Sequence, residues 1–200
     1  MTALLLIMIV TLAAAPEQDG LDRLAAALRS AKAWQTEFVQ VYTPEGFADG
    51  TTDSGRLTLV PPVRLRFDYT SGSPRVFATD GSIGRLVDPA AGSCDAVRLD
   101  AGAWGRLPLA AVLDPAAARL VFTVESRGGT LRLLPREPNP ELAEITVALD
   151  AKGMPESVTV RDTSGNSNRF SFSRWKPVTE PPAAFFQPAL PGSPPCSPDE

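Results

Sequence analysis

The sequence predicts a mainly β protein, built around one large curved antiparallel sheet with a few short helices covering it. Segments with β-type patterning recur between residues 33 and 174. Their connections are short and glycine-rich, for example Arg127-Gly128-Gly129 and Ala151-Lys152-Gly153, and such turns join antiparallel strands. Only about three short segments have helical periodicity. Together these observations predict about ten to eleven strands in a single sheet.

Residues 1–15 have the pattern of a cleavable export signal. An apolar run from Ala3 to Val10 is too short to span a bilayer, and it leads to Ala13-Ala14-Ala15, small residues that a signal peptidase accepts. No Lys or Arg precedes the run, so an uncleaved anchor or a different start of the chain remains an alternative. We expect a signal peptide over residues 1–15, one exported domain over residues 16–190 and a Pro-rich disordered tail over residues 191–200.

Helical spacing is clearest just after the predicted signal. Leu21, Leu24 and Leu28 recur on one side of a helix that follows Asp19, a residue type favoured at the N-cap. Prolines mark the starts of two further short helices, and a proline stops a last helical turn near the C-terminus. The expected helices are 21–32, 107–113 and 116–119, with one turn inside 180–188.

The clearest β alternation lies between Val63 and Tyr69. Apolar and charged residues alternate there, so one face of this strand is apolar and the other is expected to contact water. A polar turn region, residues 44–54, separates the first two strands. The expected strands are 33–42, 55–59, 63–69, 75–79, 83–88, 96–100, 120–126, 130–134, 144–150, 156–161 and 168–174.

Composition excludes several classes of function. The net charge of −4 leaves no basic footprint for nucleic acid. The chain contains no histidine, which removes the usual general base and the commonest metal ligand. Pairs of carboxylates could still act as acid and base, but no motif places two of them at a recognisable spacing. We therefore expect no enzyme activity and no metal site.

The two cysteines, Cys94 and Cys196, lie far apart in the chain. In an oxidising compartment they could form a disulfide that ties the tail to the domain. Closing so long a loop contributes roughly 4 to 5 kcal/mol in the chain-entropy model. Two unpaired thiols in mobile segments are the alternative.

A sheet of this size has to cover its apolar face, and a strongly twisted one curls or splits into two layers. If it curls, the apolar face forms a trough under the helices that can hold an alkyl chain. If it splits, the same residues fill the core of a sandwich, and periodicity alone favours this arrangement. The residues expected to contact a cargo are Leu57, Leu59, Leu65, Phe67 and Tyr69 from the sheet, with Leu24, Leu28 and Leu113 from the helices.

Several short motifs occur in a shared order and spacing along almost the whole chain. They are Phe38-x-Gln40, Gly55-x-Leu57-x-Leu59, Pro62-x-Arg64-Leu65-Arg66-Phe67-x-Tyr69, Thr79-Asp80-Gly81, Leu107-Pro108-Leu109 and Val160-x-Asp162-x-x-Gly165. In this order they resemble the LolA family of periplasmic outer-membrane lipoprotein carriers, from Leu21 to about Pro191.

The resemblance implies an incomplete β-barrel closed by helices. Its apolar interior shields the acyl chains of a lipoprotein in transit from the inner to the outer membrane. It further implies a periplasmic protein without cofactor, expected to be a monomer. Such a protein receives acylated lipoproteins from an inner-membrane release complex and passes them to an outer-membrane receptor.

The chain departs from the family pattern at two places. Pro61 stands where well-known members have an Arg that helps to control the lid. The stretch from Ser82 to Val87 lacks the aromatic residue that members usually carry after the Asp-Gly turn. The gating role is therefore not transferred to this chain. A carrier of another lipid stays an alternative, as does a cargo-free interaction or sensor module of the cell envelope.

Three further side chains allow two interpretations each. Arg66 either holds a carboxylate at the mouth of the trough or points into solvent from the outer face of its strand. Phe185 and Phe186 either line the trough or dock a ring into the core. The Asp80-Gly81 pair is expected to form a hairpin turn without a chemical role.

Overall fold

The computed structural model describes residues 20–99 and 115–198. They form one antiparallel sheet of eleven strands in the order β6-β5-β4-β3-β2-β1-β11-β10-β9-β8-β7. Two meanders meet at the centre of this sheet, where the first strand pairs with the last. The strands are β1 (Trp34–Thr43), β2 (Thr51–Val60), β3 (Arg64–Tyr69), β4 (Arg75–Thr79), β5 (Ile83–Asp88), β6 (Ser93–Arg98), β7 (Phe122–Arg127), β8 (Thr130–Pro135), β9 (Glu144–Leu149), β10 (Pro155–Arg161) and β11 (Ser167–Pro177).

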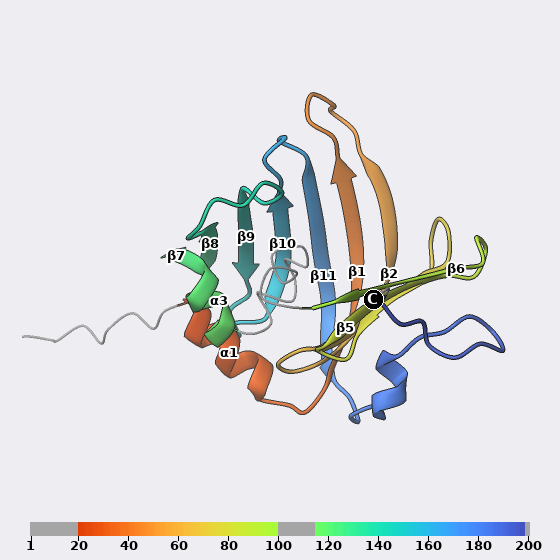
Figure 1. The fold of residues 1–200 in the computed structure, drawn as a ribbon. Coiled ribbons are helices and arrows are strands. Elements are labelled where there is room, and N and C mark those ends of the chain that lie inside the picture. The colour runs from red at the N-terminus through yellow and green to blue at the C-terminus, as the bar shows by residue number, and fades with distance from the viewer. Residues whose placement is uncertain (1–19, 100–114, 199–200) are drawn as a thin grey trace, which may run out of the picture.

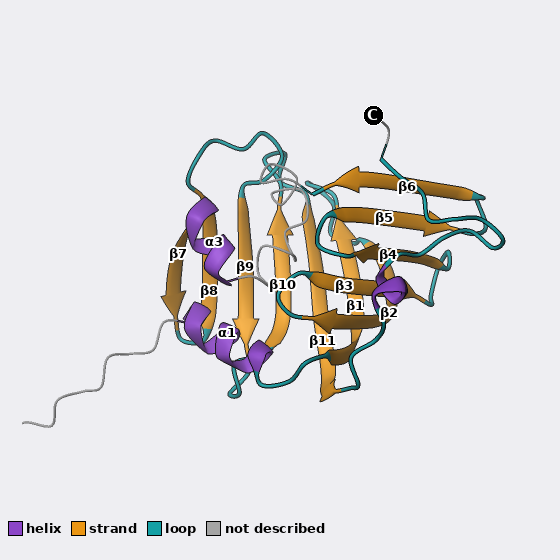
Figure 2. Cartoon of the chain, turned by 60° about the horizontal axis from the view of Figure 1, so that its bottom comes forward, coloured by secondary structure: helices purple, strands orange, loops and turns teal. Residues whose placement is uncertain are grey.

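Two short helices and one 3-10 turn accompany the described strands: α1 (Gly20–Arg29), α3 (Pro115–Val121) and η2 (Ala183–Phe186). Strands β3–β6 run across the direction of β7–β11, so the sheet is strongly curled (Figures 1 and 2). Helices α1 and α3 lie over β7–β9, and η2 lies beside β3. Strands β6 and β7 are the edges and do not pair with each other within the described residues, so the sheet stays open. The predicted fold class is confirmed.

Helix α1 packs its leucines onto one face of the sheet, which we call the inner face. Leu24 and Leu28 are at most 1% exposed. The helix starts close to β8, because a Cβ on Gly20 would lie only 2.3 Å from Leu131 Cδ2. It ends at Arg29, earlier than predicted. The indole Nε1 of Trp34 donates a hydrogen bond of 2.9 Å to the carbonyl of Leu28, so the first residue of β1 satisfies a carbonyl at the helix end.

Each predicted strand overlaps a strand of the structure, and the largest difference in strand bounds is at the start of β2. This strand begins at Thr51, inside the segment predicted to be a polar turn. Pairing with β1 continues to the Tyr42–Thr51 pair, although neither residue is apolar. Asp53 Oδ2 also accepts a hydrogen bond of 2.8 Å from Arg75 Nη2 in β4. Cross-strand pairing and a distant ion pair therefore extend the strand where local composition predicts a turn.

Residues 178–198, which we call the C-terminal segment, cover part of the opposite, outer face. Phe186 is fully buried there in a small cluster with Ala33 and Val60. The guanidinium groups of Arg64 and Arg66 lie 5.5 and 4.6 Å from the ring centroids of Phe186 and Phe185. The prediction that the charged face of β3 contacts water is thus only partly right, because aromatic rings from the C-terminal segment stack on the arginines.

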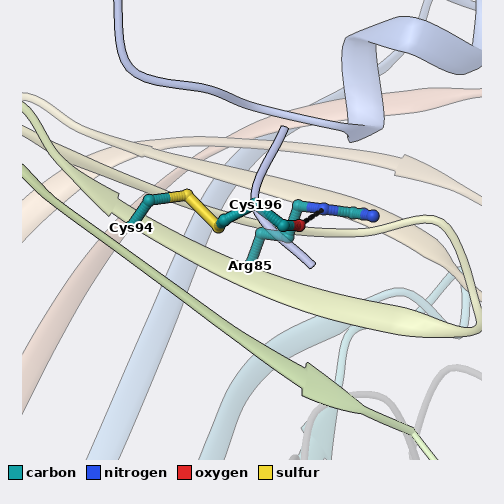
Figure 3. Close-up of a disulfide and its surroundings, with 3 residues drawn as sticks. All are labelled: Arg85, Cys94 and Cys196. Atoms are coloured by element: carbon teal, nitrogen blue, oxygen red, sulfur yellow. Dashed lines mark hydrogen bonds between the residues drawn. A yellow bond between two sulfur atoms is a disulfide. The ribbon is translucent and has the colours of Figure 1, made fainter. Parts of the chain in front are cut away.

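A disulfide between Cys94 and Cys196 links this segment to β6, with a Cα–Cα distance of 6.0 Å (Figure 3). Arg85, only 6% exposed, donates through Nε to the carbonyl of Cys196 at 2.9 Å and through Nη1 to Asp80 Oδ2 at 3.1 Å. Composition predicted disorder for residues 191–200. Of these, residues 191–198 are described, and the disulfide attaches them to the sheet.

The two motif turns have the geometry of tight hairpins. Gly81 and Gly165 both have positive φ angles, 99° and 92°, which favour glycine. Asp80 accepts hydrogen bonds from the backbone of Ser82 and Ile83. Burial opposes the charge of Asp80, but these bonds and the one from Arg85 outweigh it and hold the pKa of the carboxyl well below its usual range. Asp162 likewise accepts a hydrogen bond from Asn166 across its turn.

Replacing Gly55 by Ala should destabilise the fold. A Cβ there would lie 2.0 Å from the backbone oxygen of Asp68 in β3 and 3.0 Å from the ring of Phe38. We expect a loss of about 1–3 kcal/mol, typical of overpacking, measured by urea unfolding. Gly84→Ala is the matched control, since its Cβ would meet side chains at ordinary contact distances of 3.4–3.5 Å. Equal stability of the two variants would contradict the close approach of β2 and β3.

Removal of the disulfide in the double variant Cys94→Ser/Cys196→Ser should lower the free energy of unfolding. The cysteines are 102 residues apart, so the cross-link removes substantial entropy from the unfolded chain. We expect a loss of about 4 kcal/mol in denaturant unfolding. The parent protein in a thiol reductant is the control, because it loses the cross-link but keeps both cysteine side chains. An unchanged unfolding midpoint in the double variant would show that the tether does not stabilise the domain.

Candidate functional site: the inner apolar face

Aromatic rings from three central strands form the middle of the inner face. Phe38 of β1 makes edge contacts with Phe67 and Tyr69 of β3, each at a centroid distance of 5.1 Å. Phe170 of β11 lies 5.6 Å from Phe67. Gly55 of β2 lies between Phe38 and Tyr69 in the sheet register and has no side chain to separate these rings. We call these rings the aromatic floor.

Helices α1 and α3 cover only one side of this face. The leucines of α1 and Ala118 of α3 are buried with Leu131, Leu133 and Ile145 of β8 and β9. Strands β3–β6 lie away from these helices (Figure 2), and β1 meets α1 at the helix end, where Trp34 donates to Leu28. The part of the inner face outside these helices is the part of interest, because a lipid chain can bury only apolar area that is exposed.

Six of the predicted cargo-contact residues belong to the same buried cluster on the inner face. Each is at most 4% exposed: Leu24, Leu28, Leu57, Leu59, Leu65 and Phe67. Tyr69 is half-buried on the same face, and Leu113 lies outside the described residues. The structure therefore brings these side chains together, but mainly as packed core.

The apolar surface left accessible comes from neighbours that the sequence analysis did not select. In the sheet register, Leu86 lies opposite Phe77, and Val97 lies opposite Gly84, so all of them belong to the inner face. Leu86 is 37% exposed and Val97 is 42% exposed. Phe77, Phe170 and Phe172 are partly exposed. The alternation of Phe170 and Phe172 with serines was a signal for this face, whereas nothing local distinguished Leu86 from a core leucine.

Polar side chains replace the apolar ones at one end of the aromatic floor. Tyr69 Oη donates to Gln40 Oε1 at 2.7 Å, and Gln40 Nε2 donates to Asn168 Oδ1 at 3.0 Å. Arg75 forms an ion pair with Asp53 at 2.8 Å, and its guanidinium lies 4.1 Å from the centroid of the Tyr69 ring. We call these five residues the polar row. The sequence analysis named Gln40 only as a motif position. It did not select Asp53, Arg75 or Asn168, which come from strands far apart in the sequence.

Burial raises the pKa of Tyr69 from 10.0 to about 12, although the nearby Arg75 acts in the opposite direction. The phenol therefore keeps its proton at neutral pH and acts as a hydrogen-bond donor. Arg75 is held in its charged form, chiefly by the hydrogen bond to Asp53, which raises its pKa further. The polar row thus combines neutral hydrogen-bond donors with an ion pair whose two charges cancel.

Arg66, Phe185 and Phe186 do not reach the inner face. Arg66 Nε donates to Asp68 Oδ1 at 2.8 Å, and its Nη1 donates to the carbonyl of Phe185 at 2.9 Å, both on the outer face. The interpretations that placed Arg66 at a trough mouth, or the two phenylalanines along the trough, are therefore wrong. Strict alternation in β3 puts Arg66 on the face opposite Leu65 and Phe67.

Two surface hollows lie away from the inner face. A hollow of about 170 Å³ on the outer face is lined by Gln35, Thr36, Glu37, Arg56, Arg174 and Lys176. A more open one of about 480 Å³ lies between the end of α1 and the β2–β3 turn. Most side chains that line the two hollows are polar or charged, so neither hollow is suited to bind an alkyl chain.

No helix within residues 20–99 and 115–198 is long and apolar enough to cross a membrane. The same residues contain no group of three or more His, Cys, Asp or Glu side chains that could hold a metal ion.

The family model described as outer membrane lipoprotein carrier protein LolA matches residues 29–189 of this chain. An outer-membrane lipoprotein carrier protein from Methylibium petroleiphilum is 27% identical over 87% of this chain and 87% of its own length. One from Leptothrix cholodnii is 26% identical over 86% of this chain and 82% of its own length. A solved structure of an uncharacterised conserved protein from Thermus thermophilus shares the fold, with a TM-score of 0.51 at 14% identity, covering 86% of this chain and 93% of that one.

The burial of Tyr69 can be tested by titration. In the variant Tyr42→Phe, Tyr69 is the only tyrosine left. Its ultraviolet phenolate absorbance should appear at a pH of about 12 instead of 10.0. The raised pKa belongs to the folded state, so this group stabilises the fold fully below pH 10.0, and the contribution is lost as the pH rises toward about 12. If Tyr69 ionises with a pKa of 10.0, its hydroxyl is exposed to water and the predicted burial is wrong.

Proposed function

Because the chain belongs to the LolA family of outer membrane lipoprotein carrier proteins, we propose that it carries lipoproteins through the periplasm with their acyl chains bound on the inner face. The family consists of carriers and not of enzymes. In this proposal the protein takes acylated lipoproteins from a release complex in the inner membrane and delivers them to a receptor in the outer membrane.

The accessible apolar surface of the inner face is the observation that carries the proposal. Leu86, Val97 and the partly exposed rings of Phe77, Phe170 and Phe172 lie on one concave side of a sheet that the described helices cover only in part. Each methylene that leaves water contributes about 0.8 kcal/mol, so one long acyl chain supplies on the order of 10 kcal/mol before ordering costs. This is enough to hold a lipid anchor out of water.

The remaining features are consistent with a passive periplasmic carrier. The disulfide is of the kind that persists outside the cytoplasm. A carrier that uses no nucleotide has to pass its cargo down a gradient of affinity, so its own affinity must lie between those of its donor and its acceptor. We propose that it works as a monomer, because each copy has its own inner face.

The binding face can be tested with two valines of nearly equal exposure. Val97 on the inner face is 42% exposed, and Val39 on the outer face of β1 is 44% exposed. Val97→Glu, like Leu86→Glu, should weaken binding of a fluorescent acyl probe at least about tenfold, because a carboxylate is costly to bury beside an alkyl chain. Val39→Glu should bind the probe as the parent protein does.

The same probe separates this function from its rival. A parent protein that takes up no probe, and that carries no acylated molecule in native mass spectrometry after purification from a periplasm, would favour the cargo-free interaction module. Equal weakening by Val97→Glu and Val39→Glu would place acyl binding elsewhere than on the inner face.

A further inference from the structure

We propose that the polar row recognises the uncharged carbonyl of an ester- or amide-linked acyl chain and disfavours the carboxylate of a free fatty acid. The inference rests on the proposed function and specifies which end of the cargo lies where. It gives the inner face a selectivity for acylated molecules over the fatty acids that accompany any membrane.

The position of the row sets the direction of the cargo. Tyr69 belongs to the aromatic floor through its ring and to the polar row through its hydroxyl. An alkyl chain lying on the accessible rings of Phe77, Phe170 and Phe172 beside the floor therefore reaches polar atoms first at the polar row. The carbonyl that ends an acyl chain would lie at this boundary, with the polar remainder of the cargo pointing away from the floor.

The hydrogen bonds of the row leave a donor for that carbonyl. They run in one direction, from the Tyr69 hydroxyl to Gln40 and from the Gln40 amide to Asn168. The Asn168 amide nitrogen has no partner among residues 20–99 and 115–198. Asn168 is partly exposed, so a bound carbonyl oxygen can accept a hydrogen bond from it.

The charges of the row do not favour an anion. Within residues 20–99 and 115–198, Arg75 is the cation at this end of the inner face, and two of its nitrogens face the Asp53 carboxylate at 2.8 and 3.5 Å. Its side chain and that of Asp53 are only 24% and 22% exposed, so water screens the pair weakly. Asp88 adds a second negative charge near Arg75. A fatty acid carboxylate would lose its hydration without gaining a free cation, whereas an ester or amide carbonyl needs only a donor.

Removing the negative partner should reduce this selectivity. In Asp53→Asn the residue keeps its shape, but Arg75 loses its main counter-charge and becomes available to a carboxylate. Free fatty acid should then bind more tightly, while binding of the uncharged ligand stays the same. A gain of binding separates this effect from simple damage to the fold.

The experiment compares lauric acid with N-lauroylglycine methyl ester as competitors for the fluorescent acyl probe, at a pH at which the acid is ionised in water. For the parent protein we expect the uncharged amide to bind at least about tenfold more tightly than laurate. Asp53→Asn should narrow this difference to less than about threefold through tighter laurate binding. Asp68→Asn is the matched control, because it breaks the ion pair with Arg66 on the outer face, one residue from Tyr69. It should keep the tenfold preference.

Two further variants keep the proposal testable if Asp53→Asn does not fold. The double variant Asp53→Asn/Arg75→Gln restores a neutral row and should retain the preference for the uncharged ligand. Asn168→Leu should weaken binding of the amide ligand at least about threefold, because it removes the donor that faces the bound carbonyl.

The outcomes distinguish this inference from the proposed function. If both ligands compete with equal strength and neither row variant changes their ratio, the inner face binds acyl chains but the polar row does not select them, and the inference fails alone. If neither ligand competes for the parent protein, the inference and the carrier function fail together.

Discussion

The pairing of β1 with β11 is the interaction on which the rest of the structure depends. It joins a meander of β1–β6 to a meander of β7–β11, which share no other strand pairing in the described residues. It also places Phe38 beside Phe172 and Gln40 beside Phe170, so the aromatic floor and the polar row both cross this seam. Because its partners are separated by more than a hundred residues, the seam has to form against a large loss of chain entropy.

Different segments cover the two faces of the curled sheet, and this division permits an accessible inner face. On the inner face, α1 buries its leucines over β8 and β9 and leaves the neighbouring rings partly uncovered. On the outer face, the C-terminal segment buries Phe186 and stacks on the arginines of β3, and the disulfide holds its end at β6. Because the C-terminal segment stabilises the sheet from its outer face, apolar residues on the inner face can remain available for a ligand.

The same local signals that predicted the strands failed where distant residues decide. Alternation located β3 almost to the residue, because side chains on a strand must point to opposite faces, and β-type composition located β4 and β5. The start of β2 was missed, since Asp53 is held in a strand by Arg75 from β4. The pairing of Cys196 in the Pro-rich tail was left open, because it depends on a cysteine about a hundred residues earlier.

The sequence alone determined the fold class, the faces of the strands, the hairpin turns and the order of motifs that resembles the LolA family. These follow from periodicity and from residues such as Gly81 and Gly165, whose backbone preferences act locally. Only the tertiary structure decided that Leu57 and Leu65 are packed core while Leu86 and Val97 are accessible, because burial depends on what lies opposite a side chain. It also brought Asp53, Arg75 and Asn168 from three strands to one end of the aromatic floor, a meeting that no spacing within the chain encodes.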